Sequence, residues 1–468
     1  MRASTPATRR IPRCPPLPLR FLSAGRWVRM VTMRIDTLEL RNFCLFEHRQ
    51  FMLAGRFNLL IGDNGTGKTS ILNGLAVGLG AWFLGLPEGS IARSISKEEV
   101  RFRSFHLGDI YTREKQFPAV VSCKGMIGGE IGAWSRELNH LHGRTTRQNA
   151  GWIEMIAHNL DGRVRAGDPA ILPVISYYGT GRLWVQKRQK SIVPISPSSR
   201  FLGYLDCLAP ASDEKRLLSW FKTREIQAIQ QRKSIAVLEA VRSAILACVE
   251  GATHIWFNVA EDELLLRFSD REVPFDYLSD GYRNMLAMVA DIAVRCVTLN
   301  PTLGAKAIRE TPGVVLIDEI DLHLHPKWQR RMVADLLAAF PRIQFVATTH
   351  SPFIIQSLLP DDGTQLVNLD NAEADGFANR SVEDIAQDLQ GVEEPSRSRR
   401  YWAMMKAAEE YYRTLERTDT TSPRELELLK DRLDELASRF SDDPAYHAIL
   451  KVEREARLGK NGVHDAPG

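Results

Sequence analysis

The segment Gly62–Thr69, with the sequence GDNGTGKT, constrains the fold more than any other part of the chain. The short apolar run 57–61 precedes it and predicts a buried strand, and the apolar positions that follow predict a helix over about 69–76. A glycine-rich loop between a strand and a helix turns backbone N–H groups toward phosphate oxygens, at the positive end of the helix dipole. The segment therefore predicts a phosphate-binding loop with a nucleoside triphosphate as its ligand.

The residue types in this loop suit a triphosphate and its metal ion. We expect Lys68 to contact the β and γ phosphates and Thr69 to offer its hydroxyl to Mg²⁺. The predicted nucleotide-binding residues of the loop are Asn64, Gly65, Gly67, Lys68, Thr69 and Ser70. A chance glycine-rich turn is the alternative, and the matching strand and helix on either side disfavour it.

Composition places the chain among ordinary globular proteins. Its 468 residues are 44% hydrophobic and 25% charged, which is enough chain for one large or two medium domains. No apolar run reaches the roughly 18 residues that a membrane-spanning helix needs, so we expect no membrane partner. The six cysteines show no CxxC spacing, which argues against a zinc site or a disulfide framework and favours a cytoplasmic location.

The net charge of +4 belongs to the first 33 residues. They hold seven arginines and no lysine, aspartate or glutamate, so the rest of the chain is slightly acidic. We expect 1–33 to be a disordered or mis-started basic prefix, with an organelle transit peptide as the less favoured interpretation.

The remaining pattern predicts an ATPase domain over 34–380, with a helical and basic insertion at about 183–250, and a helical C-terminal region over 381–468. Expected strands lie at 34–40, 41–46, 57–61, 119–123, 170–178, 255–259, 263–268, 313–317 and 343–349. Expected helices lie within 212–250 and 284–297 and, after a capping residue at Ser381, at about 395–417, 423–440 and 444–458.

Two of these strands deliver candidate catalytic residues. The run 313–319, GVVLIDE, ends in Asp318, which we expect to hold Mg²⁺ through its water shell, and Glu319, which we expect to orient or deprotonate the attacking water. The run 343–350, IQFVATTH, brings His350 to the carboxyl edge of a parallel sheet, where a contact with the γ-phosphate is expected. A purely structural histidine is the alternative.

The segment 278–283, LSDGYR, precedes an apolar helix. Ser279 and the N–H groups at Gly281 stand where a helix N-terminus can receive an anion. The motif is weak by itself and gains meaning from its place between a predicted β-hairpin and the strand that ends in two acids.

In their order these motifs resemble the ATP-binding-cassette ATPases of the SMC, RecF and OLD branch. The matching stretches are TLELRNFCLF, GDNGTGKTS, LSDGYR, IDEIDLHLHP and ATTHSP, between residues 34 and 356. The resemblance implies an α/β P-loop NTPase of the ABC/SMC-head type: a mainly parallel sheet flanked by helices, an antiparallel β subdomain, a helical subdomain and a helical C-terminal tail. It also implies ATP and Mg²⁺ as cofactors and hydrolysis of ATP to ADP and phosphate.

The same resemblance implies a head-to-tail homodimer that encloses two ATP molecules. Ser279 and Gly281 would then touch the γ-phosphate held by the other subunit's loop, and Asp321 would belong to the loop that communicates across the interface. The usual glutamine of the ATP-sensing loop has no clear counterpart, because 178–182 occupies its expected site.

Further stretches are similar to the AAA-labelled bacterial ATPases that include PtuA, of the Septu antiphage system and of some retrons. They are ISYYGTGRLW, GYLDCLAP, LLSWFK and SVEDIAQDLQGVEEP. This resemblance implies antiviral defence and a separate HNH-type nuclease, restrained or released according to nucleotide state.

A RecF-like ATPase that binds duplex DNA during repair is the alternative function. The basic cluster around Trp184, with Arg182, Lys187, Arg188 and Lys190, favours it, although a solvated basic loop explains the same residues. A nuclease within this chain is disfavoured, because the 118 residues after His350 are expected to be largely helical.

Overall fold

The computed structural model describes residues 32–87, 92–107, 110–183, 199–210, 214–359, 363–370, 377, 380–392, 395, 398–415 and 423–438. The basic prefix, most of the basic stretch after residue 183 and the helix expected at 444–458 lie outside these residues.

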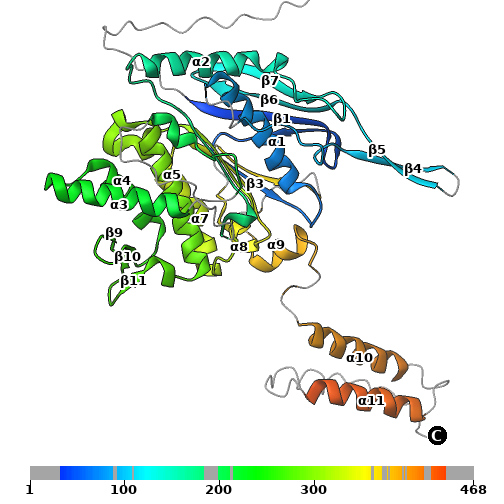
Figure 1. The fold of residues 1–468 in the computed structure, drawn as a ribbon. Helices are drawn as coiled ribbons and strands as arrows, with labels where there is room; N and C mark the ends of the chain where they lie inside the picture. Colours follow the sequence, from blue (N-terminus) through cyan, green and yellow to red (C-terminus); the bar gives the residue numbers. More distant parts are fainter. Residues whose placement is uncertain are drawn as a thin grey trace, which may run out of the picture.

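A five-stranded parallel sheet forms the centre of the body (Figure 1), in the order β14-β3-β13-β12-β8. Its strands are β3 (Phe57–Ile61), β8 (Val174–Tyr178), β12 (Gly313–Ile317), β13 (Ile343–Thr348) and β14 (Thr364–Asn368). Four of them are buried at every residue, as expected of a parallel sheet covered on both faces. The predicted strands 57–61 and 313–317 are confirmed, as is the strand expected at 343–349.

The strand expected over 170–178 begins later than predicted. The backbone N–H of Leu172 donates to the side chain of Asn300, and the carbonyl of Pro173 accepts from the hydroxyl of Tyr204. These bonds use side chains instead of a neighbouring strand, so the strand starts only at Val174.

A four-stranded antiparallel sheet, in the order β2-β1-β6-β7, covers helix α1 (Lys68–Gly80). Its strands are β1 (Met33–Phe43), β2 (Phe46–Met52), β6 (Ala119–Ile127) and β7 (Glu130–Leu138). The predicted hairpin is present, but residues 41–43 extend the first strand and do not start the second. The turn falls at Cys44, and Phe43 pairs with Phe46 across it. Together with the parallel sheet, this sheet confirms the predicted α/β class with an antiparallel subdomain.

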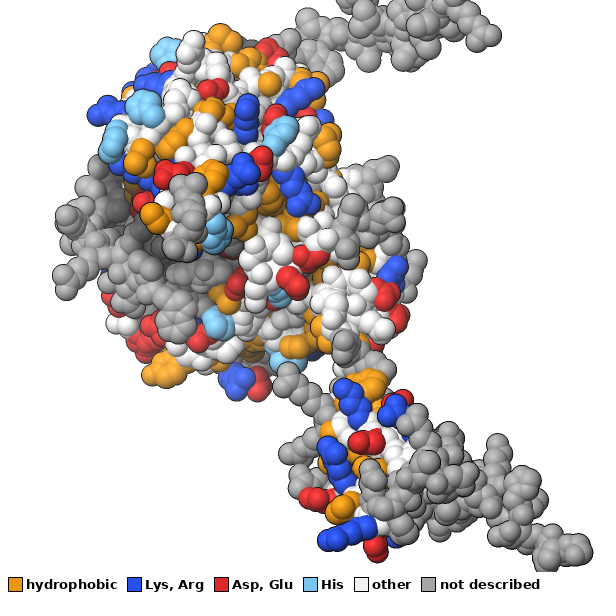
Figure 2. All heavy atoms as spheres, turned by 90° about the vertical axis from the view of Figure 1, so that its right-hand side faces the viewer, with side chains coloured by type: hydrophobic (Ala, Val, Ile, Leu, Met, Phe, Trp, Pro, Cys, Tyr) orange, Lys and Arg blue, Asp and Glu red, His pale blue; other side chains and the backbone are white. Residues whose placement is uncertain are grey.

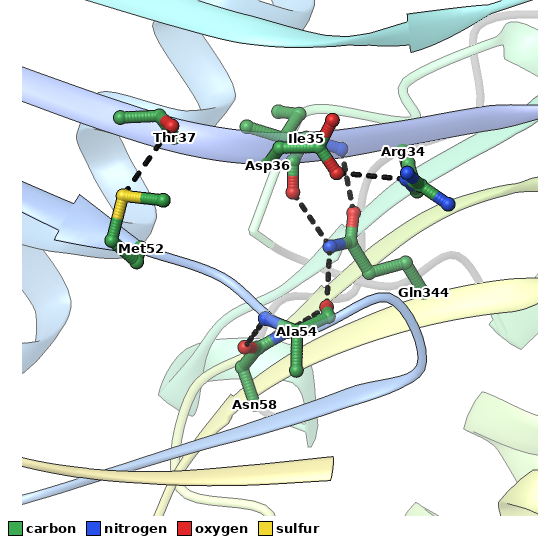
Figure 3. A network of polar contacts seen from close by, with 8 residues as sticks. All are labelled: Arg34, Ile35, Asp36, Thr37, Met52, Ala54, Asn58 and Gln344. Carbon is green, nitrogen blue, oxygen red and sulfur yellow. Dashed lines mark hydrogen bonds and ion pairs between the residues drawn. The ribbon is translucent and has the colours of Figure 1, made fainter. Parts of the chain in front are cut away.

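Buried amide side chains join the two sheets (Figure 3). Gln344 on β13 is 1% exposed; its Oε1 accepts from the Ile35 N–H at 2.8 Å, and its Nε2 donates to the carbonyls of Ile35 and Ala54 at 2.7 and 2.8 Å. Asn58 on β3 likewise bonds both backbone groups of Ala54, at 2.7 and 2.9 Å. The side-chain amides of Gln344 and Asn58 therefore provide hydrogen-bond partners for the backbone N–H and C=O groups of Ile35 and Ala54.

Replacing Gln344 by leucine is expected to lower the free energy of unfolding by about 2–4 kcal/mol, because buried backbone groups of Ile35 and Ala54 lose a hydrogen-bond partner. Urea denaturation measures the change. The matched control is Gln50→Leu on the exposed face of β2, which should stay within about 0.5 kcal/mol of wild type. Equal losses in the two variants would show that the amide does not hold the sheets together.

A two-stranded hairpin, β4 (Phe102–Leu107) with β5 (Ile110–Lys115), projects from the antiparallel sheet (Figure 1). The sequence pattern did not predict it. Arg113 lies over the rings of Phe102 and Tyr111, and both rings are half-exposed. Figure 2 looks onto the side of the molecule toward which the hairpin points, and shows hydrophobic and basic side chains next to one another in its upper part.

Helices fill the space between the predicted motifs. The insertion contains α3 (Glu214–Gln231) and α4 (Ala236–Cys248), followed by the predicted hairpin as β9 (His254–Asn258) and β10 (Glu263–Arg267), which β11 (Glu272–Pro274) extends. The other main helices are α2 (Gly151–Arg165), α5 (Asp280–Leu299), α6 (Ala307–Glu310), α7 (Pro326–Ala339) and α8 (Pro352–Ser357). No helix in the described part of the chain is long and apolar enough to cross a membrane.

Among the described residues, three helices follow the central sheet. The first, α9 (Val382–Asp388), begins with the predicted cap: Ser381 and Asp384 form a reciprocal capping box. The others, α10 (Arg399–Leu415) and α11 (Pro423–Ser438), pack against each other around Met404, Tyr411 and Leu433. The expected helix start at Pro395 is wrong, because that residue lies in a turn.

Candidate nucleotide-binding site

The parallel sheet brings three predicted motifs to one edge. β13 lies between β3 and β12, and all three strands run in the same direction. Their carboxyl ends carry the phosphate loop, the acids Asp318 and Glu319, and His350. Residues that are nearly 290 positions apart in the sequence therefore meet at the edge where open α/β sheets bind ligands.

The phosphate loop needs its glycines for backbone conformation and for packing. Gly65 and Gly67 have φ values of 87° and 101°, in the left-handed region. A Cβ on Gly67 would also lie 2.6 Å from the ring of Phe46. Helix α1 starts at the next residue, so its N-terminal N–H groups face the loop. Asn64 and Thr69 are exposed on the open side of the loop, and Ser70 is half-buried.

Lys68 is 8% exposed and folds back over the loop. Its Nζ donates to the carbonyls of Gly62 and Asp63 at 2.6 and 2.9 Å. Burial lowers the pKa of the Lys68 ammonium below its ordinary value, and the carboxylates of Asp370 and Asp318 partly offset that effect. The ammonium is thus held against the loop by two backbone carbonyls.

A continuous hydrogen-bond chain connects the loop to the two acids. The hydroxyl of Thr69 donates to Asp318 Oδ2 at 3.0 Å, and the hydroxyl of Thr348 donates to Asp318 Oδ1 at 2.7 Å. The backbone N–H of Glu319 donates to the same Thr348 hydroxyl at 2.7 Å. Glu319 has a φ of 50°, an uncommon backbone conformation for a residue with a side chain and one that clusters at functional sites.

The groups at Thr69 and Asp318 fit a magnesium ion. Mg²⁺ prefers oxygen ligands and is commonly held by one or two carboxylates together with substrate phosphates. A hydroxyl and a carboxylate that already touch each other beside the phosphate loop provide such oxygens. Among the described residues no cluster of three or more His, Cys, Asp or Glu side chains could hold a metal.

His350 follows β13 and has an exposed side chain. The segment around it is fixed: Thr349 Oγ1 donates to Asp321 Oδ1 at 2.5 Å, and the hydroxyl of Ser351 donates to Gln329 Oε1 at 2.5 Å. The first bond ties His350 to the loop that follows the acids. The imidazole is therefore exposed, while the residues on either side of it are hydrogen-bonded.

The signature segment, residues 278–283, packs against the loop at 318–325, which we call the acid loop. A Cβ on Gly281 would lie 2.2 Å from the carbonyl oxygen of His323, so glycine is required for this approach. Asn284 Nδ2 also donates to the carbonyl of Leu322 at 3.1 Å. Ser279 is exposed at the start of α5, and its hydroxyl does not cap that helix. The start of α5 and the acid loop thus form one packed unit.

The loop after β8 has a different arrangement from the one expected of an ATP-sensing loop. Tyr178 is buried, and its hydroxyl donates to Asp291 Oδ2 on α5 at 2.7 Å. Burial raises the pKa of Tyr178 well above its ordinary value, so the phenol remains a donor. Arg295 also donates to Asp291, at 2.7 Å. Tyr178 therefore connects the sheet to α5, and no glutamine stands at residues 178–182. In the basic cluster only Arg182 lies within the described residues.

Sequence reasoning assigned no role to Thr348, Asp370 or Gln390. The carboxylate of Asp370, directly after β14, accepts from the backbone N–H of Asp63 at 2.7 Å and so anchors the start of the phosphate loop. Gln390 Nε2 donates to the carbonyl of His350 at 2.7 Å. Thr348 had a usable signal, since it precedes the predicted His350 at a strand end; the other two contacts depend on long-range packing.

Comparison with known protein families gives two matches that together cover the site. An AAA domain family matches residues 37–248, and the family described as "AAA domain, putative AbiEii toxin, Type IV TA system" matches residues 243–356. The first match includes the phosphate loop, and the second includes Ser279, both acids and His350.

Several named proteins are similar over shorter segments. The Retron Vc95 probable ATPase of Vibrio cholerae is 48% identical over 19% of this chain and 16% of its own length. The Septu protein PtuA of Bacillus mycoides is 36% identical over 26% of this chain and 16% of its own length, and that of Bacillus thuringiensis is 30% identical over 28% and 36%. The chain thus spans about a third or less of the length of these relatives.

Among solved structures, an SMC head bound to the C-terminal winged-helix domain of ScpA shares 16% identity, with a TM-score of 0.42 over 70% of this chain and 95% of that one. This likeness is too low to support an argument about function. The family matches and the named relatives together identify the chain as an AAA-domain protein related to the Septu PtuA and retron ATPases.

Proposed function

We propose that this protein is an Mg²⁺-dependent ATPase that dimerises on ATP and controls a separate nuclease in antiviral defence. The observation that carries the proposal is the hydrogen-bond chain from Thr69 through Asp318 and Thr348 to Glu319. It fixes, at the phosphate loop, one carboxylate suited to a metal and the backbone of the residue that carries the second.

The chain's own groups supply the steps of hydrolysis. The loop N–H groups and Lys68 bind the phosphates, while Asp318 and Thr69 would hold Mg²⁺, which neutralises developing phosphate charge. Glu319 accepts a proton from the attacking water as that water's oxygen bonds to the γ-phosphorus. The bond from the γ-phosphorus to the β,γ-bridging oxygen then breaks, which yields ADP and phosphate. His350 stabilises the γ-phosphate from the neighbouring strand.

Dimerisation is supported by the exposed start of α5. Tyr277 is 81% exposed, and the Ser279 hydroxyl is exposed and not engaged in capping its own helix. In a head-to-tail dimer, this hydroxyl and the N–H groups at the helix start would receive the γ-phosphate held by the other subunit.

Ser279→Arg is expected to leave ATP binding to the isolated chain within about twofold of wild type and to abolish ATP-driven dimerisation, because a bulky cation would occupy the contact with the other subunit. Light scattering coupled to size-exclusion chromatography, with and without ATP, measures the effect. Ser438→Arg, at the end of α11, is the control and should dimerise like wild type. Retained dimerisation of Ser279→Arg would contradict the trans contact.

The nuclease partner and the defence role rest on relatedness to the Septu and retron proteins. An open reading frame next to this one with a His-Asn-His nuclease motif would identify the partner.

A further inference from the structure

A cavity of about 210 Å³ lies beside the phosphate loop. Gly62, Asp63 and His350 line one side of it, and Leu389, Gln390 and Val392 line the other. The second group belongs to the turn that follows α9, so a segment 40 positions beyond His350 forms part of the wall of this cavity beside the phosphate loop.

This turn has a defined conformation. The N–H of Val392 donates to the carbonyl of Ala386 at 2.9 Å, and Gly391 has a φ of 66°, which a residue with a side chain adopts only with strain. A helix C-terminus closed in this way turns the chain back, and here it directs Gln390 toward the site.

The turn is attached to the body through α8 and α9. Ile385 on α9 is fully buried, and Gln356 on α8 donates to the carbonyl of Arg380 at 3.0 Å. Arg380 forms an ion pair with Asp388 at 2.7 Å, at the end of α9. Helix α8 begins directly after the His350 segment, so any shift of that segment is transmitted to α9 along two routes: through α8 and through Gln390.

The hydrogen bond from Gln390 acts on the backbone of His350 and not on its ring. Gln390 Nε2 donates to the His350 carbonyl at 2.7 Å. Such a hydrogen bond weakens steeply once its donor–acceptor distance or its angle departs from the favourable range. The position of that carbonyl sets where the exposed imidazole points. Through this bond Gln390 therefore controls the position of the His350 imidazole, which is expected to meet the γ-phosphate. Gln390 acts on His350 and not on the nucleotide.

We propose that the turn Leu389–Val392 reads the nucleotide state of the site, with Gln390 as the positioning residue for His350. Movement of His350 onto a bound γ-phosphate changes the bond to Gln390, and the turn passes this change to α9, the helix that it closes. The inference rests on the proposed ATPase function and names the segment through which that function is regulated.

The test compares Gln390→Leu, which removes the donor at similar size, with Gln390→Lys, which keeps a donor of sufficient length. The control is Gln387→Leu, an exposed glutamine on α9 one turn earlier. We expect Gln390→Leu to bind an ATP analogue within about twofold of wild type and to lower kcat about three- to tenfold, with KM little changed. Gln390→Lys should recover most of kcat, and Gln387→Leu should match wild type.

Hydrogen exchange measures how ATP changes the protection of each segment. If Gln390 had only a structural role, this ATP-dependent change would be the same in Gln390→Leu as in wild type. In wild type, ATP should change exchange at 389–392 and at α9, and Gln390→Leu should reduce the change at α9. If Gln390→Leu equals Gln387→Leu in kcat and in ATP-dependent exchange while wild type hydrolyses ATP, the inference is wrong and the proposed ATPase stands. If wild type itself neither binds nor hydrolyses ATP, the proposed function fails first. If Gln390→Leu does not fold, Gln390→Lys is compared with wild type instead. A kcat of Gln390→Lys as low as that of a catalytically inactive variant would overturn the positioning role.

Discussion

Glu319→Gln is expected to lower ATP turnover by about 10²–10⁴-fold while ATP still binds, because the amide has the shape of the carboxylate but cannot take a proton from water. The substitution leaves the backbone bond from Glu319 to Thr348 in place, so the local structure should persist. Phosphate release measures turnover, and light scattering should show that an ATP-bound dimer accumulates.

The control for Glu319→Gln is Glu130→Gln, at an exposed position at the start of β7, which should hydrolyse ATP at the wild-type rate. If Glu319→Gln hydrolyses ATP at the wild-type rate, Glu319 does not act as the proton acceptor in the reaction. A loss of turnover together with a loss of ATP binding would instead indicate a disturbed site, since Glu319 adjoins the carboxylate of Asp318 that bonds to Thr69.

Lys68→Ala is expected to weaken ATP binding by about 10²-fold or more, because hydrogen bonds to charged groups contribute about 1.5–3 kcal/mol each. The ammonium of Lys68 already sits against the loop carbonyls of Gly62 and Asp63, so little side-chain ordering is needed when phosphate binds. Titration calorimetry with a slowly hydrolysed ATP analogue measures the affinity.

Lys124→Ala on β6, whose side chain is exposed, is the matched control and should bind like wild type. If Lys68→Ala binds the analogue as tightly as wild type does, the assignment of the phosphate loop fails. Circular dichroism of both variants should match wild type, because the phosphate loop lies at the edge of the sheet and Lys124 lies on the surface.

The sequence predicted the strands and motifs whose patterns are complete within a short window of residues. β3, β12 and β13 are short, mainly apolar runs, each followed closely by the residues of a motif, and this combination is visible without knowledge of the packing. Neighbouring parallel strands then bring their following motifs to one edge, which is why the loop, the acids and His350 could be placed together.

The missed parts depend on partners distant in the sequence. β14 is an edge strand in which three of the five residues are only partly buried, so its pattern is weak. The start of β8 is set by Asn300, 128 positions away, and Asp370 meets Asp63 across 307 positions. The hairpin β4 and β5 lacks an apolar face that a period of two would reveal. No window of local sequence contains the contacts of Asn300 and Asp370.

The close approach of Gly281 to His323 has a consequence for the smallest working unit of this protein. In the proposed dimer, the surface that meets the other subunit and the loop that carries Glu319 cannot shift independently. Contact with the other subunit would therefore also act on the loop that carries Glu319, and the response would depend on how many copies are present as well as on how much ATP there is. The cell could then set the threshold of such a switch by the level at which it makes the protein.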